Sequence, residues 1–352
     1  MGAARFGIFD HIEGIEGTPP SRLFKDRLEL ITMADQGGFA GYYLAEHHGS
    51  DLCMAPSQEV FIAAASQVTE NIRLGPMVKL LPMHHPVRII EDMCVLDHLT
   101  EGRLDFGVGR GAVPIEHHWF GREWTESRDR FVDVLGIIER ALAGDQISSE
   151  GSRFFDFHPV PLSARPFQER IPFWYPGNPT TAGRHGLNLM WPGKIDEAAY
   201  EEYLRSWEHH KDDDIRLSGP DATPRVAYSM LLAIAPTEDE AVQIARRGIE
   251  GLVRRTRRSH RFDPLILPED ECEAAQGPLR AIIANMEVAV RAGAGTPGQI
   301  AERLADLLED GMSDYICFML PTGDMTADEA KRTLDLFITV VKPQLDGLTG
   351  TG

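Results

Sequence analysis

The sequence predicts an α/β fold, a (β/α)8 TIM barrel with insertions. Short apolar runs alternate with longer amphipathic segments along most of the chain, which is typical of a parallel sheet covered by helices. Eight such runs can be counted, and a length of 352 residues accommodates a barrel with insertions. No short repeat or Pro/Ser-rich linker divides the chain, so we expect a single domain over residues 1–352.

The expected elements follow one another in strand–helix order. The first strand reads FGIF, the third contains a glycine and a proline, and glycines end the first and fourth helices. The expected strands cover residues 6–9, 42–45, 72–81, 104–108, 172–175, 187–191, 226–235 and 313–320. The expected helices cover residues 20–36, 56–68, 86–99, 127–142, 238–258, 281–290 and 327–341.

Two stretches break this alternation. Residues 151–167 contain FFDFHPVPL, whose alternating aromatics and two prolines indicate an inserted hairpin or loop. Residues 260–295 indicate loops around one helix. We expect both insertions to wall the pocket at the active face of the barrel. The aromatics of the first insertion suit either an apolar organic substrate or core packing.

Composition excludes several classes of partner. The formal net charge of −19 argues against nucleic acid and anionic membrane surfaces, although a few local arginines can still bind an anionic cofactor. No apolar run approaches the ~20 residues of a membrane helix, and none resembles a signal peptide. The four cysteines form no CxxC pair and indicate reduced thiols. We therefore expect a cytoplasmic protein.

Titratable residues follow the second expected strand. Residues 46–48 read EHH, and the carboxyl ends of barrel strands form the active face. A histidine there can stabilise a developing anion or move a proton. Alternatively, one histidine faces solvent and the other is a structural donor. Adjacent residues of an extended chain point in opposite directions, so we expect one of His47 and His48 to reach the barrel mouth.

Glycine-rich segments follow two other strands. In FGVGRG, residues 106–111, Gly109 lets the backbone approach a ligand and Arg110 offers a planar fork to a phosphate or carboxylate. The alternative is a glycine turn with a surface arginine. A Rossmann motif is not indicated, because the third glycine comes one residue early. In PGNPTT, residues 176–181, the turn and its hydroxyls suit an anion or form an ordinary helix N-cap.

Three further features have simpler explanations. The proline-containing segment 74–86 is either a bulge at the barrel rim or an irregular peptide beside a ligand. The paired histidines elsewhere lack an HExxH pattern, so no metal site is predicted. The basic run RRTRRSHR, residues 254–261, is interpreted as a helix end that pairs with local acids.

Taken together, these pieces resemble the bacterial luciferase-like flavin monooxygenase family. Their order and spacing carry the resemblance, most densely from residue 42 to residue 130. The matching pieces are AEHH at 45–48, IRLG…LP…HPVR at 72–88, ED…LD.LT.GR at 91–103, FGVGRG at 106–111, FG at 120–121 and SRDRF at 127–131.

The resemblance implies a TIM barrel that binds reduced FMN at the strand carboxyl ends. The flavin would react with O₂ to a C4a-peroxide that oxygenates a small organic substrate. It also implies a separate flavin reductase that supplies the reduced FMN, and a homodimer. Two alternatives stay open on the same fold: hydride transfer with F420, and flavin binding without catalysis. Relatives that use F420 usually show an Asp-His pair where this chain has Glu46-His47, which favours FMN.

The resemblance also assigns roles residue by residue. His47 matches the histidine tied to peroxide formation and decay, and His48 is a second candidate. Met77-Val78 matches a pair joined by a non-proline cis peptide against the flavin ring. Arg110 matches an arginine that holds the FMN phosphate.

Further phosphate contacts follow from the same resemblance. Arg128 matches a second phosphate-binding arginine. Gly177 and Thr180 fall where the family places a serine and a threonine that bind phosphate, with Asn178 between them.

The chain departs from the family at three glycines. Gly109 stands where luciferases proper carry a reactive cysteine, and Gly177 leaves at best a backbone N–H where the family has a hydroxyl. Both departures argue against light emission. Gly49 follows EHH where an aromatic is expected, which predicts a wider pocket.

Overall fold

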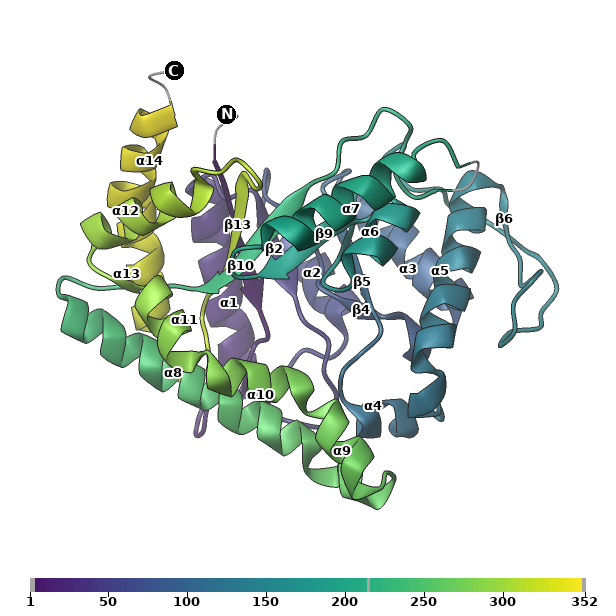
Figure 1. The fold of residues 1–352 in the computed structure, drawn as a ribbon, viewed down its shortest axis with the longest axis horizontal. Helices are drawn as coiled ribbons and strands as arrows, with labels where there is room; N and C mark the ends of the chain where they lie inside the picture. The colour runs from purple at the N-terminus through teal and green to yellow at the C-terminus, as the bar shows by residue number, and fades with distance from the viewer. Residues whose placement is uncertain (1–3, 214–215, 350–352) are drawn as a thin grey trace.

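Nine parallel strands form the central sheet of the computed structural model, which describes residues 4–213 and 216–349. Their order is β3-β2-β1-β13-β10-β9-β8-β5-β4, and only Met77 and Val78 separate β3 from β4. These two strands are parts of one strand position, so the ends of the order meet. A further bridge joins Leu74 to Leu104. Eight strand positions thus close into a barrel, which confirms the predicted (β/α)8 fold (Figure 1).

The strands lie close to their expected positions. In the parallel register, Ile8 of β1 lies opposite Tyr42 of β2 and Phe318 of β13. The barrel strands are β1 (Arg5–Asp10), β2 (Gly41–Leu44), β3 (Arg73–Pro76), β4 (Lys79–Leu80), β5 (Phe106–Gly109), β8 (Phe173–Tyr175), β9 (Asn188–Pro192), β10 (Val226–Leu231) and β13 (Tyr315–Met319).

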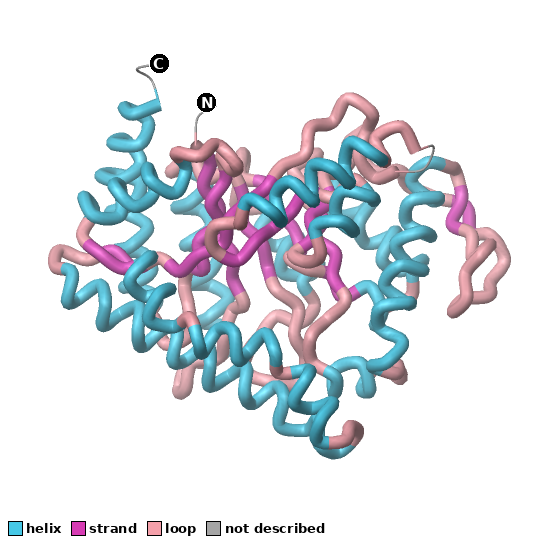
Figure 2. The backbone as a smooth tube through the Cα atoms, in the orientation of Figure 1, coloured by secondary structure: helices cyan, strands magenta, loops and turns pink. Residues whose placement is uncertain are grey.

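Helices surround this sheet and connect successive strands (Figure 2). Those that follow the barrel strands are α1 (Pro20–Gln36), α2 (Gln58–Ser66), α3 (Pro86–Leu99), α4 (Pro114–Trp119), α5 (Ser127–Ala143), α6 (Pro179–His185), α7 (Glu197–His209), α8 (Glu238–Ser259), α12 (Pro297–Leu308), α13 (Ala327–Leu336) and α14 (Lys342–Thr349). None of the helices in the described residues is long and apolar enough to cross a membrane.

The sequence prediction missed α7 and α12, and local capping explains why they form. Asp196 accepts a hydrogen bond from the Ala199 amide at the start of α7. Thr296 and Gln299 form a capping box at the start of α12. Each helix buries only three residues.

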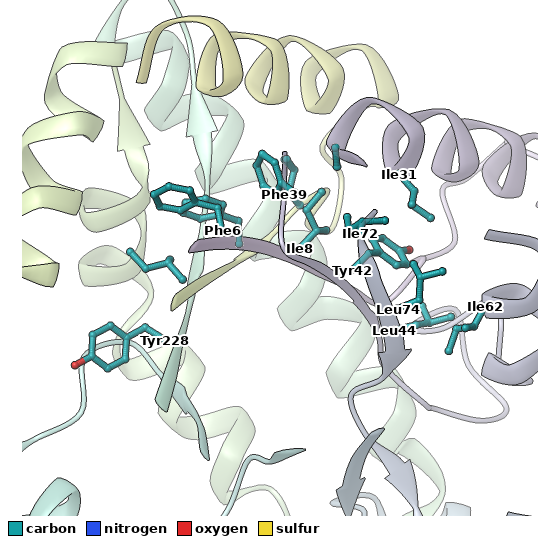
Figure 3. Packing of buried hydrophobic residues seen from close by; sticks show 14 of the residues in the cluster. Phe6, Ile8, Ile31, Phe39, Tyr42, Leu44, Ile62, Ile72, Leu74 and Tyr228 are labelled. Atoms are coloured by element: carbon teal, nitrogen blue, oxygen red, sulfur yellow. The ribbon is translucent and has the colours of Figure 1, made fainter. Parts of the chain in front are cut away.

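Two separate apolar layers fill the fold. One lies between the strands and the outer helices, where Phe6, Phe39 and Tyr42 pack together with Ile8 (Figure 3). The other fills the barrel interior and comprises Tyr43, Met77, Trp174, Met190, Ala227, Tyr315 and Cys317. Neighbouring residues of β2 thus face different layers, as the alternation of side chains along a strand requires.

The expected third strand, residues 72–81, is corrected to two short strands. The peptide between Met77 and Val78 is cis, and it interrupts the strand after Pro76. The segment that follows β4 is a 3-10 turn at Leu81–Met83. The expected strand at 226–235 also divides, because β11 (Ala233–Ile234) pairs outside the barrel with β12 (Ala294–Gly295).

The two insertions take different forms. In the first, residues 151–159 are irregular, and β7 (Val160–Pro161) pairs antiparallel with β6 (Gln146–Ile147), which lies before the expected bounds. The second is more helical than expected: a 3-10 turn at His260–Leu265 is followed by α9 (Glu269–Ala275), α10 (Gly277–Ala284) and α11 (Met286–Gly293). The expected helix at 281–290 is divided at Asn285 between α10 and α11. Together with α4, α9 and α10 lie beyond the carboxyl ends of the strands (Figure 1).

The basic run at the end of α8 pairs with local acids, as expected. Arg254 and Arg255 bind the two carboxylate oxygens of Asp324 at 2.5 and 2.7 Å. Arg258 binds Asp51 at 2.6 Å. These ion pairs tie α8 to loops at the carboxyl end of the barrel.

Candidate active site

The EHH segment lies at the carboxyl end of β2, as the sequence predicts. β2 ends at Leu44, and Glu46, His47 and His48 follow in irregular chain. Glu46 is buried, whereas both imidazoles are partly exposed. The His47 imidazole contacts Glu116 and the His48 imidazole contacts Glu46, so the two side chains point in different directions, as expected.

Glu46 is the centre of a buried hydrogen-bonded group. Its Oε1 lies 2.5 Å from His84 Nε2 and 3.1 Å from His48 Nε2, and its Oε2 accepts a hydrogen bond from the Leu80 amide at 2.8 Å. Burial opposes ionisation, but the hydrogen bonds from His48 and His84 and the charge of Lys79 hold the pKa of Glu46 well below its usual range. Glu46 therefore fixes His48 and anchors the end of β4 at Leu80.

Glu46, His48 and His84 are also close enough to one another to hold a metal ion. A divalent cation would, however, compete with the ammonium of Lys79, which lies 3.5 Å from Glu46 Oε1 and 2.6 Å from Glu59. Both imidazoles already face the same carboxylate oxygen at hydrogen-bond distance. We interpret this group as a hydrogen-bonded support rather than a metal site.

His47 contacts a carboxylate that the sequence reasoning missed. Its Nδ1 lies 3.3 Å from Glu116 Oε1, and the same oxygen accepts a hydrogen bond from the His48 amide at 2.9 Å. Burial lowers the pKa of His47, but the charge and hydrogen bond of Glu116 outweigh this effect and raise it above its ordinary value. With Nδ1 directed at Glu116 and no described residue bonded to Nε2, Nε2 is the ring nitrogen available to a bound molecule.

Two further groups lie near His47 at the end of β1. His11 stacks on the His47 ring with centroids 5.8 Å apart, and burial and the nearby charge of His47 lower the pKa of His11 to about 3. Burial and the charge of Asp10 raise the pKa of Glu13 to about 7. No described residue bonds Glu13 Oε2, while Oε1 accepts from the Gly323 amide. His47 is thus the most basic imidazole of this group.

The signal that could have located Glu116 is a helix start. Pro114 and Glu116 stand in the first turn of α4, directly after the glycine-rich end of β5, and proline followed by an acid is typical of a helix N-terminus. Asp263, from the second insertion, accepts a hydrogen bond from the Ile115 amide at 3.1 Å and holds this turn in place.

Replacing Glu116 with Gln is expected to lower the pKa of His47. The substitution keeps the shape of the side chain but removes the negative charge that favours the imidazolium form, so the proton is lost at lower pH. NMR titration of the histidine rings measures this shift. His85 is the internal control, because burial and Arg122, not Glu116, lower its pKa. A His47 titration that is unchanged in the variant would contradict the role of Glu116.

Two arginines, Arg110 directly after β5 and Arg128 in the first turn of α5, have no carboxylate partner among the described residues. Arg110 Nη1 donates to Ser127 Oγ at 3.1 Å, and its guanidinium lies 4.5 Å from the Trp124 ring centroid. Burial and the charge of Arg128 lower the pKa of Arg110. Among the described residues, no acidic side chain forms an ion pair with Arg110 or Arg128. We call Arg110 and Arg128 the arginine pair, and its two like charges favour an anion between them.

Polar side chains of the turn after β8 already have partners within the chain. Asn178 Oδ1 accepts a hydrogen bond from the Thr181 amide at 2.9 Å, so its side chain is an ordinary N-cap. The Thr180 hydroxyl binds Glu202 of α7. An anion would not approach a hydroxyl held by a carboxylate, which argues against Thr180 as a phosphate contact. The packing of α6 against α7 brings the Thr180 hydroxyl to Glu202. In the same contact, Ser206 Oγ of α7 donates to the Thr180 carbonyl.

The glycine at position 109 has a packing role. A Cβ on Gly109 would lie 2.2 Å from Cγ2 of Val78, and one on Gly107 would lie 2.5 Å from the Pro76 carbonyl oxygen. Both glycines let β5 pass close to the interrupted strand around the cis Met77-Val78 peptide. Gly109 is therefore required by the packing of Val78.

The expected widening of the pocket at Gly49 is also corrected. A Cβ at this position would lie 2.2 Å from Cζ3 of Trp119, so the indole of α4 fills the space that the missing aromatic leaves. Trp119 is 44% exposed and packs edge-to-face on Phe262 with centroids 6.1 Å apart. A residue distant in sequence supplies the aromatic surface beside EHH.

Comparison with known proteins gives a family. The sequence profile described as luciferase-like monooxygenase matches residues 4–314. Limonene 1,2-monooxygenase of Rhodococcus erythropolis is 29% identical over 228 residues, which are 63% of this chain and 58% of that protein. The oxygenase component of a flavin-dependent trigonelline monooxygenase of Acinetobacter baylyi is 26% identical over 194 residues, 53% of each chain. The matched part thus spans about half of these relatives.

Solved structures share the fold. Monooxygenase RslO1 of Streptomyces bottropensis has a TM-score of 0.80 at 23% identity, over 96% of this chain and 99% of that one. The oxygenating constituent of 3,6-diketocamphane monooxygenase of Pseudomonas putida, in complex with FMN, has a TM-score of 0.74 at 20% identity. The match covers 97% of this chain and 98% of that one. The F420-dependent tetrahydromethanopterin reductase of Methanopyrus kandleri has a TM-score of 0.64 at 18% identity, over 98% of this chain and 100% of that one.

These structural likenesses concern the barrel alone, since each identity is below 25%. The family match is broader evidence, because it covers most of the chain. It extends from the first barrel strand to residue 314, which directly precedes the last barrel strand. It also includes the EHH segment, the arginine pair and the turn after β8. The chain belongs to the luciferase-like monooxygenase family.

Proposed function

We propose that this protein is the oxygenase component of a two-component monooxygenase, which uses reduced FMN and O₂ to oxygenate a small organic substrate. The observation that carries the proposal is the arginine pair, with Arg110 directly after β5 and Arg128 in the first turn of α5. Arg110 and Arg128 have no acidic partner among the described residues, although the protein has a net charge of −19. Such a pair suits a phosphate group, which guanidinium forks bind through charge-assisted hydrogen bonds.

The residues present fit FMN. Arg110 and Arg128 would hold the phosphate, and Met77 and Val78 would contribute to the barrel surface next to the cofactor. Reduced FMN, when bound, supplies the electrons that activate O₂. The names of the relatives support this choice, since one is described as flavin-dependent and one solved structure contains FMN.

His47 is the proposed catalytic residue. Glu116 binds its Nδ1 and raises its pKa, so the imidazolium form persists to higher pH than in a free histidine. Its Nε2 can then donate a proton to a developing oxyanion or stabilise it. His48 is a weaker candidate, because its Nε2 already faces Glu46. We assign His48 a role in supporting the loop and His47 the role of proton donor.

The proposal includes partners. The relative from Acinetobacter baylyi is described as an oxygenase component, which supports a separate flavin reductase as the source of reduced FMN here. We also propose a homodimer in the cytoplasm. The two-component scheme predicts that the isolated protein oxidises no NAD(P)H by itself.

Anaerobic titration with photoreduced FMN, followed by rapid mixing with oxygenated buffer, tests the proposal. We expect saturable binding and an absorbance transient that precedes the return of oxidised flavin. A parallel titration with reduced F420 tests the alternative cofactor. Failure to bind reduced FMN, together with hydride transfer from reduced F420, would contradict the proposal. Binding of FMN without faster oxygen consumption in the presence of any organic substrate would indicate a non-catalytic flavin-binding protein.

A further inference from the structure

Tyr175 is the last residue of β8, beside the arginine pair. Its ring stacks on Phe131 of α5, with centroids 5.3 Å apart and an interplanar angle of 22°. The same helix carries Ser127 and Arg128 at its first turn. The phenol is half-buried, and its orientation is set by a helix that also contributes to the proposed phosphate site.

The Tyr175 phenol occupies the space that a side chain at position 177 would need. A Cβ on Gly177 would lie 2.2 Å from Tyr175 Cζ and 2.5 Å from its hydroxyl oxygen. Real Cβ atoms do not approach so closely, so the ring and a side chain at 177 exclude each other. A hydroxyl is therefore present where the sequence comparison expected only a backbone N–H, and it comes from two residues earlier in the chain.

The hydroxyl lies in the field of both arginines. Burial raises the pKa of Tyr175, while the charges of Arg110 and Arg128 and a hydrogen bond from the Asn178 amide oppose this rise. A phenol O–H can donate a hydrogen bond to an anion. Among the described residues, none accepts a hydrogen bond from the Tyr175 hydroxyl.

We propose that Tyr175 is a phosphate-binding residue of the cofactor site, whose hydroxyl replaces a side chain at position 177 as hydrogen-bond donor. The inference rests on the proposed function, because the anion would be the phosphate of FMN held by the arginine pair. It also gives Gly177 a specific role: the glycine makes room for the phenol. Tyr175 then supplies the hydroxyl that Gly177 lacks, while the hydroxyl of Thr180 is bound to Glu202.

The test compares FMN with riboflavin, which lacks the phosphate. Equilibrium binding of both flavins is measured on the wild type and on Tyr175→Phe, which removes only the hydroxyl. We expect the Kd for FMN to rise about tenfold, as for the loss of one hydrogen bond to a charged group, with riboflavin binding unchanged. Tyr200→Phe, at a half-buried tyrosine of α7, is the matched control and should change neither constant.

A rescue variant tests whether a side chain at position 177 can replace the Tyr175 phenol. Tyr175→Ala should weaken FMN binding, and adding Gly177→Ser should recover part of it, since the serine hydroxyl can enter the vacated volume. A preference of Tyr175→Phe for FMN over riboflavin equal to that of the wild type would overturn the role of Tyr175 alone. A wild-type protein that binds FMN no more tightly than riboflavin would instead overturn the phosphate site, and with it the proposed use of FMN.

Discussion

Replacing Arg110 with Ala is expected to raise the Kd for reduced FMN by about 30-fold. The guanidinium is fixed on Trp124 and by Ser127, so little conformational entropy is lost when it binds a phosphate. A charge-assisted hydrogen bond contributes about 1.5–3 kcal/mol, and the stated change in Kd lies within that range. Anaerobic fluorescence or absorbance titration with photoreduced FMN measures it.

Two further variants make the result specific. Arg110→Lys keeps the charge but loses the planar fork, and should fall between the wild type and Arg110→Ala. Arg88→Ala removes an exposed arginine that pairs with Asp92, and should leave FMN binding unchanged. If Arg110→Ala bound FMN as tightly as Arg88→Ala does, Arg110 would not be a phosphate ligand.

Replacing His47 with Ala is expected to reduce product formation by about 100-fold while FMN binding stays nearly intact. The loss corresponds to the usual contribution of a positioned acid or base. His47 interacts with Glu116 and His11 rather than with the arginine pair, so the phosphate site should not change. With an organic substrate found by screening, product and hydrogen peroxide are measured per O₂ consumed, and the share released as peroxide should rise.

His118 supplies the control for this prediction. It is an exposed histidine of the same short helix that carries Glu116, and His118→Ala should behave as the wild type. Unchanged coupling of oxygen consumption to product in His47→Ala would remove His47 from the mechanism. Equal losses in both variants would point to disruption of α4 rather than to proton transfer at His47.

The parts of the site that could be predicted are those set by neighbouring residues in the chain. The EHH segment follows an apolar strand, and the glycines before Arg110 end another, so both were placed at the carboxyl end of the barrel. The same reasoning missed Glu116, because α4 has only six residues and carries no periodic pattern. It also assigned Thr180 to the anion, although Glu202 of the next helix binds that hydroxyl.

The sequence by itself determined the eight strand positions, the closed barrel and the segments that reach its active face. These features depend on local alternation of apolar and polar residues, which a single chain displays directly. Only the tertiary structure decided which side chains meet there. Trp119 fills the space at Gly49, Val78 requires Gly109 and the Tyr175 phenol excludes a side chain at 177. The reason is physical: each side chain is placed by packing between elements distant in sequence, and that packing has no local pattern.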